Sequence, residues 1–264
     1  MLETRDLTIR FGGHVAVDRV SCRFEAGTLT AIVGPNGAGK TTYFNLISGQ
    51  LAASSGQVLL DGVDLTGLTA PLRTRRGLGR AFQLTQLFAN LSVLENVRLA
   101  VQAREAGRGR GGGIGGLDLL RVWSDRREWL DEAQHILQSV RLGDKAAAHA
   151  SSLPHGDQRK LEVALLMALD PSVFMFDEPT AGMSVDEVPV ILDLIRALKA
   201  RRDRTILLVE HKMDVVRELA DRIIVLHNGQ LVADGEPAAV IASPVVQQAY
   251  LGITLGITPQ PEVA

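Results

Sequence analysis

The fold of this 264-residue chain is decided by one stretch, Gly34-Pro35-Asn36-Gly37-Ala38-Gly39-Lys40-Thr41-Thr42. The apolar run Leu29–Val33 precedes it, and Tyr43–Gly49 follows it with the pattern of a helix. A strand, a glycine-rich loop and a helix in this order fit G-x-x-x-x-G-K-[ST], which is typical of a loop that binds phosphate groups. Because the strand, the spacing, the lysine and the threonine all agree, we favour this interpretation over an ordinary glycine-rich turn.

Each residue type in the loop has a physical role. The glycines permit positive φ angles and let the backbone approach a bound anion closely. The N–H groups of the loop then point inward at a helix N-terminus, which carries roughly half a positive charge. Lys40 adds a full charge for the β- and γ-phosphates, and the Thr41 hydroxyl is placed to coordinate Mg²⁺, a cation that prefers oxygen ligands.

The composition excludes several classes of protein. The chain has 28 lysines and arginines against 30 aspartates and glutamates, so we expect no nucleic-acid partner. Cys22 is the only cysteine, which rules out an internal disulfide bond and suits a reducing compartment. No apolar run approaches the ~20 residues of a membrane-spanning helix, and the first residues lack a signal-peptide pattern. We therefore expect a soluble protein, in which any membrane role depends on a partner.

The N-terminal segment predicts a small antiparallel sheet. Residues 2–10 alternate apolar and polar side chains, and a second strand-like stretch covers Val15–Phe24. Phe11 lies in the turn between them. Two interpretations stay open for Phe11: an aromatic residue buried at a turn, or a ring that stacks on adenine.

Strands and helices alternate on both sides of the phosphate loop, which favours a parallel sheet with helices packed on it. We expect strands at Val58–Leu60, Val173–Phe176 and Thr205–Val209, a hairpin at Asn228-Gly229, and helices at 71–76, 157–169, 185–200 and 213–220. Ser184 and Glu187 form the pattern of a capping box for the helix at 185–200. The predicted fold is α/β: a P-loop NTPase core with a mixed parallel sheet, an N-terminal antiparallel β subdomain and an inserted α-helical subdomain.

The insertion covers residues 84–160, where the pattern is helical. Ser92 with Glu95 predicts a helix start, and an amphipathic stripe follows at Trp129, Ala133, Ile136, Leu137 and Val140. Gly107–Gly116 cannot form a helix or a core, so we expect a mobile loop whose arginines either contact anionic lipid or are solvated. We predict one domain over 1–252, whose core consists of segments 1–83 and 161–240. The C-terminal tail is predicted over 241–264, so its first residues overlap the domain.

Chemically active side chains follow two buried strands of the predicted sheet. The carboxyl end of such a strand, beside a phosphate loop, is where an open α/β sheet places its site. Asp177 is placed there to hold Mg²⁺, and Glu178 to orient and deprotonate an attacking water molecule. His211 follows the next strand, where it can contact a γ-phosphate and hold Glu178. Gln83 can reach Mg²⁺ or the water from the junction with the helical block.

A further motif is Leu153–Gln158, with Pro154, His155, Gly156 and Asp157 at the start of a predicted helix. A helix N-terminus with a glycine and without its own phosphate loop indicates an anion that another chain supplies.

Together these motifs resemble the nucleotide-binding subunit of ATP-binding-cassette (ABC) transporters, over nearly the whole chain. The resemblance makes Gln83 the glutamine loop, Leu153–Gln158 the signature motif and Val173–Asp177 the second nucleotide-binding motif. It makes Glu178 the catalytic base and His211 the switch histidine. It implies ATP and Mg²⁺ as cofactors, and two subunits that close head to tail with each ATP between one phosphate loop and the partner's signature helix.

Several stretches are similar to one branch of that family, the ATP-binding subunit of branched-chain amino-acid importers, with urea and short-amide relatives. They are Arg10–Gly13, Arg80–Gln83, Gly156–Glu162, Ala181–Met183, Val209–Lys212 and Ala249–Gly252. Two places depart from the family pattern. Pro154 and His155 replace a serine and a glycine of the signature, and Ser184 stands where an aspartate is usual.

The resemblance thus implies an ATPase that energises import through integral membrane permease subunits and, indirectly, a solute-binding protein. Its second nucleotide-binding subunit is a copy of itself or a paralogue, and its location is cytoplasmic, peripheral to the inner face of the cell membrane. The rivals are a urea or short-amide importer subunit, a soluble ABC ATPase of DNA repair or translation, and a regulatory module without catalysis. The single phosphate loop and the absence of long coiled coils disfavour the soluble ATPase, and intact Lys40, Glu178 and His211 disfavour the regulatory module.

Overall fold

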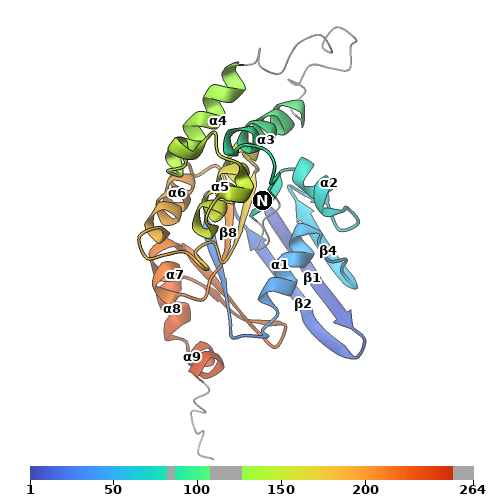
Figure 1. Cartoon of the computed structure of the whole chain (residues 1–264). Coiled ribbons are helices and arrows are strands. Elements are labelled where there is room, and N and C mark those ends of the chain that lie inside the picture. The colour runs from blue at the N-terminus through green and yellow to red at the C-terminus, as the bar shows by residue number, and fades with distance from the viewer. Residues whose placement is uncertain (82–86, 108–126, 252–264) are drawn as a thin grey trace, which may run out of the picture.

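The computed structural model describes residues 1–81, 87–107 and 127–251, and this part of the chain forms two sheets with helices packed on them (Figure 1). The strands are β1 (Leu2–Phe11), β2 (His14–Phe24), β3 (Leu29–Val33), β4 (Ser55–Leu60), β5 (Val63–Asp64), β6 (Leu78–Ala81), β7 (Val173–Asp177), β8 (Thr205–Val209), β9 (Arg222–His227) and β10 (Gln230–Gly235). The helices are α1 (Lys40–Ser48), α2 (Ala70–Arg75), α3 (Val93–Gly107), α4 (Arg127–Ser139), α5 (His155–Leu169), α6 (Val188–Ala200), α7 (Met213–Leu219), α8 (Pro237–Ala242) and α9 (Pro244–Leu251).

The smaller sheet has the strand order β2-β1-β4-β5, and its neighbouring strands are antiparallel. It confirms the antiparallel sheet expected at the N-terminus. Its apolar side chains, such as Leu2 and Phe24, are buried against α1 and one face of the larger sheet. The phosphate loop therefore lies between two layers that hold its flanking elements in place.

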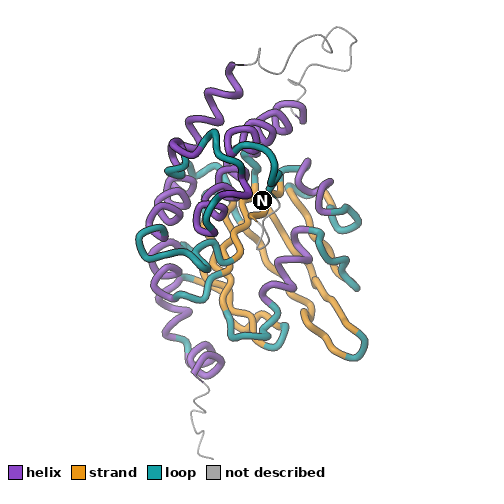
Figure 2. Tube along the Cα trace, in the orientation of Figure 1, coloured by secondary structure: helices purple, strands orange, loops and turns teal. Residues whose placement is uncertain are grey.

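The larger sheet has the order β10-β9-β3-β8-β7-β6, in which only β10 is antiparallel to its neighbour. It confirms the predicted mixed parallel sheet. Phe174 and Phe176 of β7 face the helices of the α3–α7 layer, whereas Val173 and Met175 face α1 and the small sheet. Both faces are covered, which explains why β3, β7 and β8 are buried at every position and mostly apolar, with Thr30, Thr205 and Asp177 as the exceptions. Figure 2 shows most helices along one side of the strands, while α1, labelled in Figure 1, lies among the strands, between the two sheets.

The helical insertion packs as its sequence pattern indicates. Trp129, Ala133, Ile136, Leu137 and Val140 are all buried, in one cluster with residues of α3 and α5. The Glu95 N–H donates to Ser92 Oγ over 3.1 Å, which confirms the expected cap at the start of α3. The boundary expected at residue 160 falls inside α5, which continues unbroken from His155 to Leu169 and packs on both the insertion and the sheet.

Three local predictions were wrong. Helix α6 begins at Val188 rather than at 185, with Glu187 as its N-cap residue. Of the predicted capping box, only the bond from the Ser184 N–H to the Glu187 carboxylate forms, over 3.2 Å; Ser184 Oγ does not accept a helix N–H but donates to the same carboxylate over 3.0 Å. Helix α5 begins at His155 rather than 157, directly after Pro154. The stretch 78–81, for which we predicted no strand, forms β6 by pairing in parallel with β7.

Some expectations lie outside the described residues. Gln83 is among them, as is most of the glycine-rich stretch 107–116, of which only Gly107 is described. The described part of the predicted tail contains α9 and the end of α8.

Candidate active site

The phosphate-loop motif connects the end of β3 with the start of α1. Gly39 precedes the helix with φ 97°, a left-handed conformation, and no side chain caps the first turn. The N–H groups of that turn are therefore left for an anion. A Cβ at Gly39 would lie 2.5 Å from the Ala16 carbonyl oxygen, and one at Gly34 would lie 2.2 Å from that of Leu226. Close packing on β2 and β9, as well as backbone conformation, thus requires glycine at these two positions.

Lys40 is the first residue of α1 and is only 5% exposed. Its ammonium group donates to the carbonyl oxygens of Gly34 over 2.7 Å and Pro35 over 2.9 Å. Burial lowers the pKa of Lys40, while the nearby carboxylates of Glu178 and Asp177 act in the opposite direction. The lysine is thus held in the loop, close to both acidic residues expected to act in the site.

A cavity of about 390 Å³ opens over the loop. Its lining consists of His14, Ala16, the loop residues 36–42, Glu178 and His211. The three residues predicted to be catalytic, Lys40, Glu178 and His211, therefore border one space. The carboxyl ends of β3, β7 and β8 meet there, as expected for an open α/β sheet.

Glu178 and His211 contact each other directly, with 2.7 Å between Glu178 Oε1 and His211 Nε2. Glu178 has φ 48°, a left-handed conformation that is costly for a residue with a side chain. The Glu178 N–H donates to the Val209 carbonyl over 2.9 Å, which ties the residue to the end of β8. The carboxylate is thus fixed beside the cavity by its neighbours, an arrangement suited to a general base.

Glu210 supports this pair and was not singled out from the sequence. It is 3% exposed, and its carboxylate accepts hydrogen bonds from Thr180 Oγ1 over 2.7 Å and from the His211 N–H over 2.7 Å. Glu210 therefore joins the turn after Glu178 to the turn that carries His211. Its position beside a histidine at a strand end was the available signal, but the partner Thr180 is visible only in the fold.

Asp177 ends β7 and is 2% exposed. Its Oδ2 accepts a hydrogen bond from Arg80 Nη2 over 2.6 Å, while its Oδ1 is buried and has no hydrogen-bond partner among the described residues. Burial raises the pKa of Asp177, and the Arg80 guanidinium opposes that shift. A buried carboxylate oxygen without a donor beside a phosphate loop fits a hard cation.

The described residues contain no group of three or more histidine, cysteine or acidic side chains that could hold a metal ion. Mg²⁺ in proteins typically keeps several water ligands and is bound by one or two protein oxygens together with substrate phosphates. Thr41, which lines the cavity, and Asp177 supply oxygens of that kind.

The signature residues lie at the start of α5 and do not line the cavity over the phosphate loop. A Cβ at Gly156 would lie 2.3 Å from Glu187 Oε2, and one at Gly182 would lie 3.1 Å from His155 Nε2. This end of α5 therefore packs closely on the segment between β7 and α6. Pro154 precedes the helix, and no side chain caps its first turn.

Asp157 is 5% exposed and belongs to a network of charges. Its carboxylate accepts hydrogen bonds from Lys145 and from Lys160, the latter over 2.9 Å, and Lys160 also donates to Glu187 over 3.1 Å. Burial opposes ionisation of Asp157, but the two lysines outweigh it and lower the pKa. The observed partners of Asp157 are thus lysines that join α5 to neighbouring segments.

Phe11 is 51% exposed at the turn between β1 and β2, so the interpretation as a buried aromatic residue was wrong. Stacking on adenine stays a prediction.

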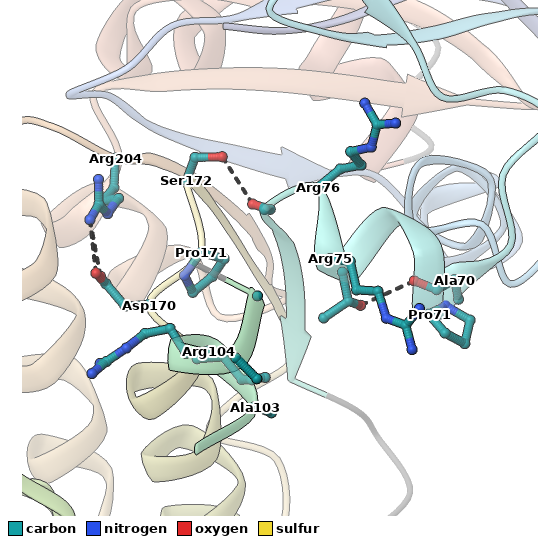
Figure 3. A pocket seen from close by; sticks show the side chains of 15 residues that line it. Ala70, Pro71, Arg75, Arg76, Ala103, Arg104, Asp170, Pro171, Ser172 and Arg204 are labelled. Atoms are coloured by element: carbon teal, nitrogen blue, oxygen red, sulfur yellow. Dashed lines mark hydrogen bonds and ion pairs between the residues drawn. The ribbon is translucent and has the colours of Figure 1, made fainter. Parts of the chain in front are cut away.

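A second cavity, of about 910 Å³, lies elsewhere, between α2, the end of α3 and the turn from α5 into β7 (Figure 3). Four arginines, Arg75, Arg76, Arg104 and Arg204, are among its lining residues. It lies at the amino ends of β6 and β7, opposite the edge where the phosphate loop and Glu178 meet. Arg204 is paired there with Asp170, as the dashed line in Figure 3 indicates.

Comparison with known proteins agrees with this geometry. The family model described as ABC transporter matches residues 17–181, which include the phosphate loop, the start of α5 and the Asp177-Glu178 pair. The chain belongs to the ABC transporter family.

Two relatives match almost the full length. The high-affinity branched-chain amino acid transport ATP-binding protein BraF of Pseudomonas aeruginosa is 37% identical over 252 residues, which cover 96% of this chain and 98% of BraF. LivG of Escherichia coli K12, a high-affinity branched-chain amino acid transport ATP-binding protein, is 38% identical over 255 residues, 96% of this chain and 98% of LivG.

The solved structure of a nucleotide-free ATP-binding cassette from an ABC transporter superposes with a TM-score of 0.78 at 28% identity, covering 96% of this chain and 99% of the cassette. The similarity confirms the fold class. Among the described residues of the present chain, no helix is long and apolar enough to cross a membrane.

Proposed function

We propose that this chain is the ATP-binding and ATP-hydrolysing subunit of an importer for branched-chain amino acids. The observation that carries the proposal is the cavity in which the phosphate loop meets the Glu178–His211 pair. The solute class rests on BraF and LivG, whose similarity extends over nearly all of this chain.

In this proposal the triphosphate lies over residues 34–42, where the uncapped first turn of α1 receives it. Lys40 exchanges its two carbonyl partners for the β- and γ-phosphate oxygens. Glu178 accepts a proton from the attacking water. His211 holds the Glu178 carboxylate through Nε2 before ATP binds, and the imidazole then turns its N–H to the γ-phosphate. Phe11, exposed at the tip of the small sheet, stacks on adenine.

Mg²⁺ fits the oxygens of Thr41 and Asp177, and Gln83 is a further proposed ligand. When bound, the ion neutralises charge on the β- and γ-phosphates. The chain's own contribution is to hold the Asp177 carboxylate at the end of β7 with one buried oxygen free of donors among the described residues.

The start of α5 is proposed to serve a second subunit, either a copy of this chain or a paralogue. Pro154, His155, Gly156 and Asp157 are away from the cavity in their own chain, and the first turn of α5 lacks a capping side chain. Its N–H groups can therefore receive the γ-phosphate bound by the partner. Pro154 offers no hydroxyl for that contact, and His155 is the available donor.

We further propose that the subunit lies at the inner face of the cell membrane, bound to permease subunits near residues 84–98 and served indirectly by a solute-binding protein. Nucleotide-dependent closure then moves the helical subdomain, expected over residues 84–160, against the core segments 1–83 and 161–240, and α5, which is continuous across residue 160, moves as one unit with the subdomain.

The test is to purify the chain with and without the permease subunits encoded near its gene. We expect Mg²⁺-dependent phosphate release, co-purification of the permease, and stimulation of hydrolysis in vesicles by a branched-chain amino acid with its binding protein. Phosphate release without any permease association would assign the chain to the soluble ATPases. Stimulation by urea or a short amide alone would replace the proposed solute.

A further inference from the structure

Arg80 is a buried arginine that the proposed chemistry does not use. It lies on β6 at the edge of the large sheet, and its side chain is 6% exposed. Its guanidinium group lies over the ring of Phe44, 5.1 Å from the ring centroid. A buried guanidinium is costly unless its donors are satisfied, so its partners show what it holds.

The partners of Arg80 come from two separate elements. Nη2 donates to Asp177 Oδ2 over 2.6 Å, at the end of β7. Nη1 lies 2.6 Å from Asn45 Oδ1, 3.0 Å from Ser48 Oγ and 2.9 Å from Gln50 Oε1, on and just after α1. Arg80 thus links the helix that starts in the phosphate loop to the carboxylate at the end of β7.

Because of this contact, the two carboxylate oxygens of Asp177 differ in their hydrogen bonding. Oδ2 is held by Arg80, while Oδ1 is buried and has no partner in the described part of the chain. A carboxylate fixed through one oxygen presents the other in a single direction. Groups of this type, behind a metal ligand, typically set both the orientation and the affinity of the ligand.

We propose that Arg80 is the positioning residue for the metal-binding carboxylate of this ATPase: it anchors Asp177 to α1 so that Oδ1 faces the cation. The inference rests on the proposed role of Asp177 at Mg²⁺. Arginine is suited to this position because its planar group reaches acceptors in two directions at once, which the compact ammonium group of lysine does not.

The experiment uses the full chain with Mn²⁺ as a spectroscopic probe. Binding of Mn²⁺ to the ATP complex is measured by electron paramagnetic resonance, and binding of ATP alone is measured in EDTA. For Arg80→Met we expect about 10- to 100-fold weaker Mn²⁺ binding. We expect ATP affinity in EDTA to change less than about twofold, because the phosphate loop is intact. The Mn²⁺ affinity of Arg80→Lys should lie between those of the unmodified chain and Arg80→Met.

Arg73→Met is the matched control. Arg73 is 2% exposed and its Nη1 donates to the carbonyl oxygens of Leu46 and Ile47 at the same end of α1, each over 2.7 Å. Its hydrogen bonds hold backbone carbonyls and not Asp177, so its loss removes a buried guanidinium without freeing that carboxylate. We expect a lower unfolding temperature and unchanged Mn²⁺ binding. Equal Mn²⁺ losses in Arg80→Met and Arg73→Met would show a merely structural role and overturn the proposal.

Two further variants complete the design. Should Arg80→Met not fold, Arg80→Lys and Asn45→Ala carry the test, and unchanged Mn²⁺ binding in both would overturn the proposal. Asp177→Asn separates the two levels of inference. If it binds Mn²⁺ as the unmodified chain does, the proposed metal role of Asp177 is wrong. If it loses Mn²⁺ while Arg80→Met does not, only the role of Arg80 is wrong.

Discussion

At the residue scale, the site consists of a few side chains that each depend on a neighbour. Glu178 meets His211 at 2.7 Å, and Glu210 fixes the backbone of His211 and the hydroxyl of Thr180. Glu178 also has a left-handed backbone conformation. Strain of this kind persists only where surrounding contacts enforce it, and it is concentrated at functional sites.

Replacing Glu178 with glutamine tests its role as the base. The amide keeps the size of the side chain but accepts a proton poorly, so we expect turnover to fall by roughly 10²–10⁴ while ATP affinity is retained. Phosphate release and nucleotide titration measure the two quantities separately. Turnover equal to that of the unmodified chain would remove Glu178 from the mechanism.

At the element scale, glycines and charges decide how helices α1 and α5 begin. Helix α1 starts from Gly39, where an added Cβ would collide with the Ala16 carbonyl of β2. Helix α5 starts from Pro154, and Asp157 in its first turn is tied to Lys145 and Lys160. The two helix starts therefore differ: packing against a strand fixes one, and ion pairs stabilise the other.

Gly39→Ala should destabilise the loop. The new methyl group would lie 2.5 Å from a backbone oxygen, in addition to the strain of φ 97°. We expect a loss of about 1–3 kcal/mol in the free energy of unfolding, and loss of ATP binding. Gly62→Ala is the control, because Gly62 has φ 80° but a methyl group added there would meet no atom within 4 Å. Urea unfolding should show a larger loss of stability for Gly39→Ala than for Gly62→Ala. Equal losses in the two variants would exclude a contribution from the contact with the Ala16 carbonyl.

Asp157→Asn should weaken the chain in a pH-dependent way. The folded-state pKa of Asp157 is lowered, so the ionised carboxylate stabilises the fold above its unfolded pKa of about 3.9, and this stability is lost as pH falls through the lower folded value. We expect the variant to be less stable by about 1–2 kcal/mol at pH 7, and the difference to shrink below about pH 4.

Urea unfolding at a series of pH values measures that difference. The matched control is Asp144→Asn, since Asp144 is exposed, in the same region of the chain. Its substitution should change stability by less than about 0.5 kcal/mol at any pH. A difference between Asp157→Asn and the unmodified chain that does not depend on pH would contradict the electrostatic origin.

At the scale of the whole molecule, the two halves of the proposed site lie apart. Lys40 and Glu178 border the cavity, whereas Gly156 lies at the start of α5, outside the cavity lining. One copy of the chain therefore presents a phosphate loop in one place and an uncapped helix start in another. Head-to-tail pairing is the arrangement that would bring them together.

Gly156→Asp tests that pairing. A negative charge at the start of α5 repels a phosphate, and the side chain collides with Glu187, whose Oε2 would lie 2.3 Å from the new Cβ. We expect Glu178→Gln with Mg²⁺ and ATP to form dimers by light scattering, and Glu178→Gln combined with Gly156→Asp to stay monomeric while it still binds ATP. Dimers of unchanged stability in the double variant would refute the proposed interface.

The sequence by itself determined the phosphate loop, the buried strands and the order of the motifs. These depend on residues close together in the chain: nine consecutive residues form the loop motif, and a continuous apolar run already indicates a strand covered on both faces. The start of α6 could not be placed as reliably, because Ser184 and Glu187 bond to each other in a turn rather than capping the helix.

Only the tertiary structure decided which distant side chains meet. Arg80 contacts Asp177, 97 positions away, because β6 pairs with β7, and the local sequence of β6 does not predict a strand. Thr180 meets Glu210 in the same way, through the adjacency of β7 and β8. Strand order in a sheet is set by the packing of the whole chain, so local pattern determines which residues can act, and the fold determines what holds them in position.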